Sequence, residues 1–200
     1  EGIFNTALAF IDAGDVALVP DPSYPTYAQS ARMAGGEVVS LPLRAERGFL
    51  PDLRGIPADA LRRAKLLWLN YPNNPTGAIA DLRFLAEAVA FAKEHQLLLC
   101  YDNPYCDVCY DGYVAPSPLQ IPGAKDVVLE FNSLSKTYNM AGWRVGMAVG
   151  SAQAVEALAR VKTNIDSGIF APIQEAAAAA LSADQSWLQE RNRIYQARRD

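Results

Sequence analysis

Short apolar runs alternate along the chain with amphipathic stretches, and this pattern predicts the secondary structure. Six runs rich in Leu or β-branched residues indicate strands at 16–19, 37–43, 66–70, 97–101, 127–131 and 145–149. Most of these runs are apolar at every position, which is typical of strands that are covered on both faces. Helical patterns occupy 2–13, 24–34, 81–95, 151–164, 170–182 and 184–199.

Strands that alternate with helices of this length indicate an α/β fold. We expect a three-layer α/β/α sandwich with a mainly parallel sheet. The last three helical patterns follow one another without a strand, so the sheet should end near residue 149. No internal repeat, low-complexity segment or linker divides the 200 residues, and we expect them to form one domain.

Composition narrows the possible functions. Half of the residues are apolar and the net charge is −4, which is typical of a globular protein and gives no indication of nucleic-acid binding. No apolar run reaches the roughly 18–20 residues that a membrane span needs. The tryptophans Trp68, Trp143 and Trp187 are expected in the core.

The cysteines indicate a reducing compartment such as the cytoplasm. Cys100, Cys106 and Cys109 form an odd and sparse set, which argues against a disulfide framework. Cys106 and Cys109 make a C-x-x-C motif, but His95 is the only histidine and a structural zinc site normally needs four ligands. We therefore expect no metal site.

Both ends of the chain resemble internal positions of a longer sequence. Residue 1 is Glu and not an initiator Met, and the last residues, "IYQARRD", lie within a helical pattern that has no cap or breaker. We expect the 200 residues to be an internal piece of a longer protein.

Three consecutive predicted strands are each followed by a side chain that can bind or react with a ligand. "YPNNPTG", with Asn74, follows 66–70; Asp102 follows 97–101; and "NSLSK", with Lys136, follows 127–131. Ligands of open α/β sheets bind at the carboxyl ends of the strands. We therefore expect an amide, a carboxylate and an amine to meet at one edge of the sheet.

This set of groups suits pyridoxal phosphate. A lysine amine can form a Schiff base with the aldehyde of this cofactor, and an acidic side chain pairs with its ring nitrogen. Lys136 and Asp102 match these two roles. A phosphate favours hydroxyl groups, a helix N-terminus and an arginine. The residues available for it are Ser133, Ser135 and Arg144, which lies in the apolar stretch "AGWRVG" and therefore indicates a buried anion.

Other polar and aromatic residues suit the cofactor ring. Tyr24 could stack on its face, with Tyr27 as a close competitor. Asn74 and Tyr105 could donate hydrogen bonds to its hydroxyl oxygen.

The motifs "YPNNPTG", "DNPY" and "SLSKTYNMAGWRVG", in this order and spacing, resemble the class I/II aminotransferases of the aspartate aminotransferase fold. The resemblance covers nearly the whole chain and implies the large domain of a fold-type-I pyridoxal-phosphate enzyme. A narrower likeness, to LL-diaminopimelate aminotransferases, rests on phrases such as "DGYVAPS", "PGAKDV" and "KTNIDSGIF".

The resemblance implies the same roles for the residues. Lys136 is the Schiff-base lysine and Asp102 the partner of the ring nitrogen, while the remaining cofactor residues are Tyr24, Asn74, Tyr105, Ser133, Ser135 and Arg144. It also implies a homodimer that transfers an amino group from an amino acid to a 2-oxo acid, as in lysine biosynthesis. The family's N-terminal arm and C-terminal small domain lie outside this chain, so the piece alone is expected to be inactive.

Three alternatives stay open at this point. One is an aminotransferase that acts on alanine or aspartate. A β-lyase that uses the same cofactor would need the same residues. Some transcriptional regulators carry an aminotransferase-like effector domain behind a DNA-binding domain.

Overall fold

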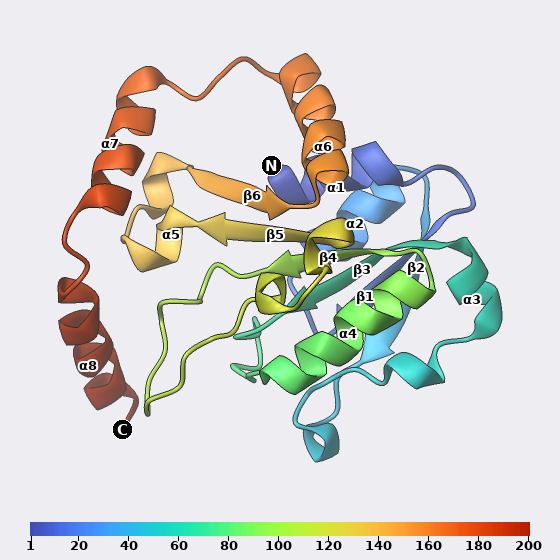
Figure 1. Ribbon diagram of the computed structural model, residues 1–200, viewed down its shortest axis with the longest axis horizontal. Coiled ribbons are helices and arrows are strands. Elements are labelled where there is room, and N and C mark those ends of the chain that lie inside the picture. The colour runs from blue at the N-terminus through green and yellow to red at the C-terminus, as the bar shows by residue number, and fades with distance from the viewer.

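A computed structural model describes all 200 residues, which build one six-stranded sheet with helices on both faces (Figure 1). The strand order is β2-β1-β3-β4-β5-β6. The strands are β1 (Val16–Asp21), β2 (Glu37–Pro42), β3 (Ala64–Asn70), β4 (Leu98–Asp102), β5 (Val128–Ser133) and β6 (Gly146–Gly150). Four of the pairings are parallel, and only the edge strand β6 runs antiparallel to its neighbour β5.

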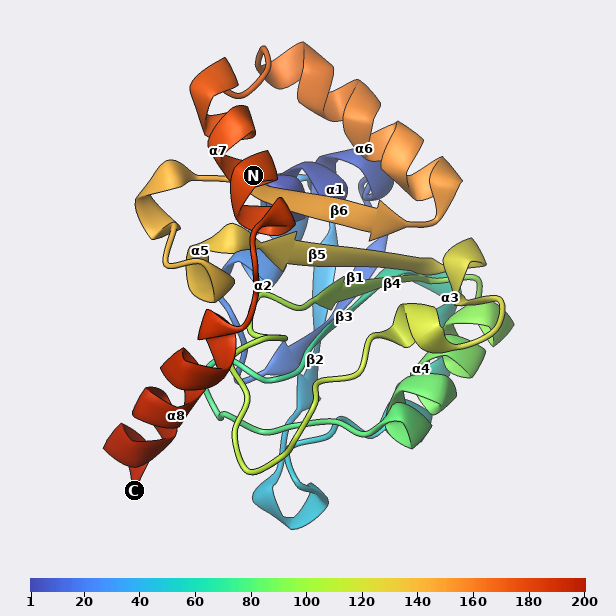
Figure 2. The same cartoon turned by 60° about the vertical axis from the view of Figure 1, so that its left-hand side comes forward.

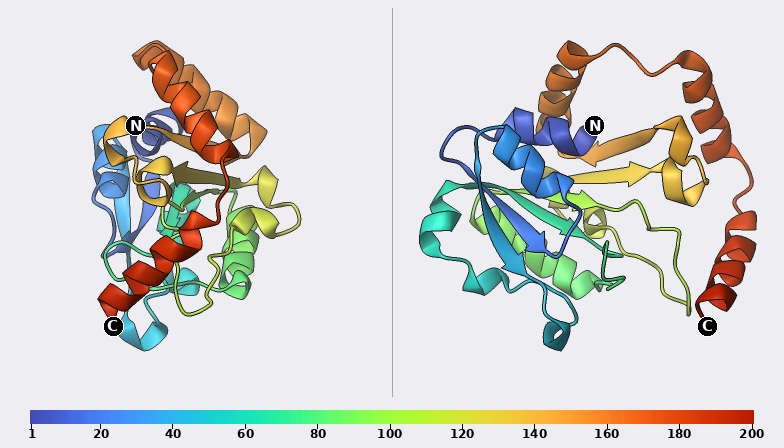
Figure 3. Two further views of the ribbon diagram at one scale, coloured as in Figure 1. Left: turned by 90° about the vertical axis from the view of Figure 1, so that its left-hand side faces the viewer. Right: turned by 180° about the vertical axis from the view of Figure 1, so that it is seen from behind.

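Helices cover the sheet in two outer layers (Figures 1 and 3). One face is covered by α3 (Ala58–Arg63) and α4 (Leu82–Glu94). The other face is covered by α1 (Gly2–Phe10), α2 (Thr26–Met33) and α6 (Ala152–Ile165). The three-layer α/β/α sandwich with a mainly parallel sheet, predicted from the sequence, is confirmed.

Each face of the sheet has its own apolar core, because alternate strand residues point to opposite sides. On the α4 face, Leu67 and Leu99 pack against Leu85 and Val89. On the α2 face, Trp68 is fully buried and lies parallel to the ring of Tyr27, with centroids 4.7 Å apart. Apolar residues at consecutive strand positions therefore serve two cores, which explains the continuous apolar runs.

The structure contains short elements that the sequence pattern did not predict. α3 occupies one and a half turns directly before β3, and α5 (Leu134–Thr137) is a single turn directly after β5. Helix α2 starts at Thr26 and not at residue 24, since Pro25 takes the N-cap position. Periodicity identifies neither short helix, because a single turn shows no repeat.

Helices α7 (Ala171–Ser182) and α8 (Trp187–Arg199) lie beyond the end of β5, on the side of the sheet where α5 follows (Figures 1 and 2). Much of their surface is exposed. The expectation that all three tryptophans are core residues is wrong for two of them, because Trp143 is 47% exposed and Trp187 is 38% exposed. None of the helices combines the length and apolarity required for crossing a lipid bilayer.

Candidate active site

The carboxyl ends of the parallel strands open into one cavity of about 800 Å³. Side chains from the turns after β1, β3, β4 and β5 line it together with residues of β6 and the first residues of α1. All eight residues singled out from the sequence are among them: Tyr24, Asn74, Asp102, Tyr105, Ser133, Ser135, Lys136 and Arg144. The structure therefore brings together the whole predicted set.

Asp102 is the last residue of β4 and contributes a carboxylate to the lining of this cavity. The residue is 8% exposed, and burial raises the pKa of its carboxyl to about 6, while a hydrogen bond from Tyr27 opposes the rise. Its carboxylate has no cationic partner in the chain, and Tyr27 is its only side-chain donor. A buried carboxylate with one unpaired oxygen is suited to bind a cationic N–H group.

Tyr27 is a site residue whose role the sequence did not reveal. Its hydroxyl donates a 2.5 Å hydrogen bond to Oδ2 of Asp102, from a fully buried ring on α2. The ring stacks on Trp68, which in turn stacks on Phe131 at a centroid distance of 5.7 Å. Burial and the neighbouring carboxylate both raise the pKa of Tyr27, so the phenol keeps its proton and acts as the donor.

Asn70, the last residue of β3, joins two of the turns that line the cavity. Its Nδ2 donates to the backbone carbonyl of Asp102 at 2.7 Å, and its Oδ1 accepts from the backbone N–H of Asn74 at 2.7 Å. Asn73 closes the same turn by accepting from the backbone and hydroxyl of Thr76. Two buried amides thus fix the turn that presents the Asn74 side chain to the cavity.

Lys136 lies in the single helical turn α5, which follows β5 without a loop. Ser133 caps this turn, because its Oγ accepts a hydrogen bond from the backbone N–H of Ser135 at 3.2 Å. The Lys136 ammonium forms no ion pair within the chain and lies 5.8 Å from the ring centroid of Tyr105. Its amine is therefore available to a ligand in the cavity.

Arg144 differs from the expectation of a buried anion site. The residue is exposed, and its Nη1 donates to the carbonyl of Ala141 at 2.7 Å. Its backbone is left-handed (φ 55°), a conformation that is uncommon outside glycine and that turns the chain into the edge strand β6. Arg144 is nevertheless among the residues that line the cavity, so its guanidinium lies at the site but is not buried in it.

Tyr24 and Tyr105 supply aromatic surface to the cavity. Tyr24 is 41% exposed and meets the ring of Tyr27 edge-on at 5.7 Å. Burial, followed by the charge of Asp102, raises the pKa of Tyr105, which favours a protonated hydroxyl that can donate. Of the two competing tyrosines, Tyr24 is accessible for stacking, whereas Tyr27 is committed to Asp102 and Trp68.

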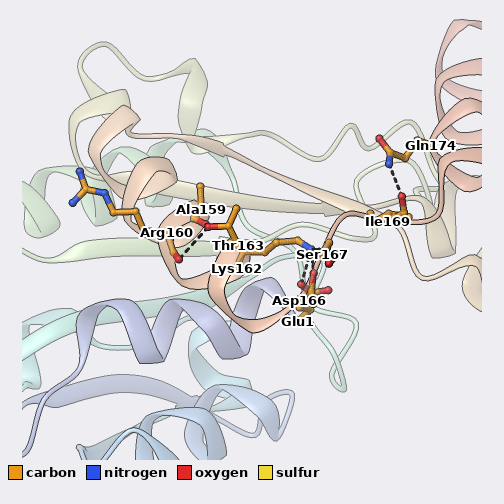
Figure 4. A network of polar contacts seen from close by, with 9 residues as sticks. All are labelled: Glu1, Ala159, Arg160, Lys162, Thr163, Asp166, Ser167, Ile169 and Gln174. Atoms are coloured by element: carbon orange, nitrogen blue, oxygen red, sulfur yellow. Dashed lines mark hydrogen bonds and ion pairs between the residues drawn. The ribbon is translucent and has the colours of Figure 1, made fainter.

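A further polar group meets the cavity from α6. Lys162 forms ion pairs with the carboxylates of Glu1 and Asp166 and donates to the carbonyl of Ser167 (Figure 4). Lys162 and Glu1 both line the cavity, so this network ties the end of α6 to the start of α1 beside the site. Sequence reasoning did not single out Lys162, whose partners lie in two separate segments.

The C-x-x-C cysteines lie on the turn that follows β4. Cys109 donates to the carbonyl of Cys106 at 3.2 Å, and all three cysteines are free thiols. Burial, more than the nearby Asp107, raises the pKa of Cys106 to about 12. No group of three or more His, Cys, Asp or Glu side chains is arranged to hold a metal ion.

Comparison with known proteins identifies the family to which the chain belongs. The family model described as "Aminotransferase class I and II" matches residues 1–200. The chain belongs to this family. Pyridoxal 5′-phosphate is the cofactor of the family, as the sequence predicted.

Curated relatives and solved structures support this membership. The chain is 58% identical to LL-diaminopimelate aminotransferase 2 of Trichormus variabilis and 56% identical to LL-diaminopimelate aminotransferase of Moorella thermoacetica. Both alignments cover 100% of this chain and 51% of the relative. The structure of a probable N-succinyldiaminopimelate aminotransferase from Thermus thermophilus superposes with a TM-score of 0.93 at 43% identity, over 99% of this chain and 53% of the other. The chain therefore spans about half the length of these class I and II aminotransferases.

The cavity of this family member fits the cofactor on its own chemistry. The unpaired carboxylate oxygen of Asp102 suits a protonated ring nitrogen, and the Lys136 amine suits an aldehyde. The side-chain amide of Asn74 and the hydroxyls of Tyr24, Tyr105 and Ser135 make no hydrogen bond within the chain. The cavity thus offers the Asp102 carboxylate, the Lys136 amine and several neutral groups to a ligand that is polar at several positions.

Proposed function

We propose that the full-length protein containing this chain is a pyridoxal-phosphate-dependent aminotransferase. It transfers an amino group from LL-diaminopimelate to 2-oxoglutarate. The observation that carries the reaction class is the meeting of the Lys136 amine and the buried Asp102 carboxylate in one cavity of a class I and II aminotransferase. The choice of donor rests on the relatives named LL-diaminopimelate aminotransferase.

The cofactor, when bound, supplies a ring that accepts the electron pair left behind as a substrate loses its α-proton. Asp102 would hold the ring nitrogen in its protonated form through the carboxylate oxygen that Tyr27 leaves unpaired. Burial strengthens this charge–charge contact, because fewer water molecules screen it. Tyr27 and Asn70 would position Asp102 from its carboxylate and from its backbone, respectively.

The other cavity residues would bind the remaining parts of the cofactor. Asn74 and Tyr105 would donate to the ring oxygen, and Tyr24 would stack on the ring face. The groups for the phosphate would be Ser133, Ser135 and Arg144. The exposed guanidinium of Arg144 would bind an anion by releasing the carbonyl of Ala141, which is its only partner in the chain.

Lys136 would act twice. At rest, its Nζ would hold the cofactor covalently. The freed Nζ would then take the proton from the substrate α-carbon and return a proton on the way to product, as general base and acid. The single turn α5, capped by Ser133, fixes the backbone from which this side chain reaches the cavity.

We further propose that the full-length protein is a cytoplasmic homodimer. Support for the compartment comes from three free cysteines that form no disulfide. Support for the dimer comes from the resemblance of the chain to the aspartate aminotransferase fold. Sedimentation of the full-length protein would test the oligomeric state, and a monomeric active enzyme would contradict it.

The test is an assay of the full-length protein with several amino donors against 2-oxoglutarate. LL-diaminopimelate should give the highest kcat/KM, above N-succinyl-LL-diaminopimelate, aspartate and alanine. A site built to pair with a distal charged group rejects analogues that lack it, often by 10⁴-fold or so. If aspartate or alanine gave the highest kcat/KM, the choice of donor would be wrong while the reaction class would stand.

The same assay separates the alternatives. A β-lyase would release ammonia without forming glutamate. An effector domain of a regulator would bind the cofactor without steady turnover, and the full-length chain would carry a basic DNA-binding segment. The relatives named above are aminotransferases, which favours the transfer reaction.

A further inference from the structure

Arg191 is a buried arginine on α8 that has no acidic partner. The residue is only 7% exposed, and no carboxylate lies within ion-pairing distance of its guanidinium. The guanidinium lies 5.4 Å from the ring centroid of Trp187 and 5.8 Å from that of Tyr195, its neighbours on the same helix. Because a buried charge is costly unless polar groups compensate it, the partners of this guanidinium identify what it serves.

Its partners are mainly backbone carbonyls of two turns that line the active site. Nη1 donates to the carbonyl of Thr137 and, at 3.4 Å, to that of Lys136. Nη2 donates to the carbonyl of Asp107 at 2.5 Å. The side chain of Asn192 accepts from the same guanidinium and itself donates to the Asp107 carbonyl at 2.9 Å.

The carbonyls of Lys136 and Thr137 have no other donor. They belong to the C-terminal end of α5, where the last carbonyl groups of any helix lack intrahelical partners. No backbone N–H donates to either of them, because the N–H groups of Tyr138 and Met140 both go to Leu134. A cation that donates several hydrogen bonds in a fixed fork suits this end of a helix.

The same contacts join the Lys136 turn to the turn that carries Tyr105. Asp107 accepts a hydrogen bond from the Thr137 hydroxyl at 3.0 Å through its carboxylate and one from Arg191 through its carbonyl. The two turns are therefore fixed to each other by one direct bond and by the guanidinium that bridges them. Tyr105 lies two residues before Asp107, and Lys136 lies one residue before Thr137.

We propose that Arg191 is a positioning residue for the active-site lysine. Its guanidinium holds the backbone of Lys136 and Thr137 against the Tyr105 turn, so that the Lys136 amine meets the cofactor at a fixed place relative to Asp102 and Tyr105. The proposal builds on the proposed function, because it assumes that Lys136 reacts with the cofactor. The hydrogen-bonding pattern itself is independent of that function.

The test uses four variants of the full-length protein. Arg191→Met removes all the donors and retains an apolar stem, whereas Arg191→Lys retains a charge and part of the donor set. Asn192→Ala removes a contact between α8 and Asp107 and one acceptor of the Arg191 guanidinium, but it leaves the donors to the carbonyls of Lys136 and Thr137 in place. Arg193→Met controls for loss of an exposed arginine on the same helix.

The first readout needs no cofactor. Amide hydrogen exchange of the cofactor-free protein, at the peptide covering Lys136–Met140, should become at least tenfold faster in Arg191→Met than in Asn192→Ala or Arg193→Met. The second readout is the rate at which the cofactor-free protein develops visible absorbance after addition of pyridoxal phosphate. This rate should fall about tenfold or more in Arg191→Met and recover in part in Arg191→Lys. Turnover should lose kcat with little change in KM.

The outcomes separate the two hypotheses. If the wild-type protein gains no visible absorbance with pyridoxal phosphate, the proposed function fails, while the exchange data still decide the role of Arg191. If Asn192→Ala matches Arg191→Met in both readouts, Arg191 only docks α8 and the inference is overturned. Wild-type exchange and wild-type kinetics in Arg191→Met would also overturn it. If Arg191→Met does not fold, Arg191→Lys decides the question. Slowed cofactor attachment at an unchanged melting temperature in Arg191→Lys supports the proposal. Attachment at the wild-type rate in Arg191→Lys refutes it.

Discussion

Replacing Asp102 with Asn should make the cofactor-free protein more stable and the complete enzyme much less active. Burial raises the pKa of the Asp102 carboxyl from 3.8 to about 6 in the folded chain. The folded state therefore binds this proton more tightly than the unfolded state does. Stability from this group is fully present below about pH 4 and is lost as the pH rises through about 6.

The magnitude follows from the size of the shift. A shift of about 2 pKa units corresponds to roughly 3 kcal/mol, at about 1.4 kcal/mol per unit. Asn has nearly the same shape as Asp, can still accept the hydrogen bond from Tyr27 and has no charge to bury. The free energy of unfolding of Asp102→Asn should therefore exceed that of the wild type by roughly 3 kcal/mol at pH 8, and the gap should nearly close at pH 4.

Urea denaturation of the cofactor-free full-length protein, in steps between pH 4 and pH 8, measures this difference. Asp59→Asn, an exposed carboxylate on α3, controls for the loss of one negative charge. Turnover of the cofactor-loaded variant should fall by about 10³-fold or more, equivalent to roughly 4 kcal/mol of transition-state stabilisation. A stability gap that does not change with pH, or near-normal turnover, would refute the assignment of Asp102 as a buried anion reserved for the cofactor.

Three further predictions concern other residues that line the cavity. Tyr27→Phe should raise the pKa of Asp102 further, by about 1–2 units, because a hydrogen bond to a charged group contributes about 1.5–3 kcal/mol. NMR titration of labelled aspartate measures this pKa, and an unchanged value would contradict the prediction. Borohydride reduction followed by peptide mapping should locate the cofactor on Lys136, and a label on Lys162, which also lines the cavity, would contradict that role. Arg144→Leu should weaken cofactor binding about 10–100-fold, through loss of one charge-assisted bond to phosphate, and equilibrium dialysis that finds wild-type affinity would show that Arg144 does not bind it.

The sequence predicted the sheet and the site residues because both depend on local patterns. Most strands contain a continuous apolar run, and Asn74, Asp102 and Lys136 each follow a predicted strand within a few positions. Parallel strands bring these positions to one edge whatever the details of packing. The order of the strands and the antiparallel direction of β6 follow from contacts between distant segments, and no local pattern indicates them.

The residue roles that sequence reasoning missed depend on long-range contacts. Tyr27 and Asp102 are 75 positions apart, and Arg191 and Thr137 are 54 apart. Tyr27 resembles any amphipathic helix residue until the sheet places Asp102 beneath its hydroxyl. Arg191 resembles one of several arginines on a solvated helix, and only the packing of α8 against α5 shows that it is buried. Lys162 was missed for the same reason.

The two ends of the parallel strands carry turns that differ in how they can tolerate mutation. The turns after β1, β3, β4 and β5 line the cavity at the carboxyl ends of parallel strands. The turns at the amino ends, such as 95–97 before β4 and 122–127 before β5, line no part of it. We therefore expect mutations in the turns at the amino ends to affect folding more than chemistry, and mutations in the cavity turns to affect chemistry with little effect on the two cores. A lineage that acquires a new substrate can therefore change the turns at the carboxyl ends of the strands while the turns at the amino ends continue to support the same fold.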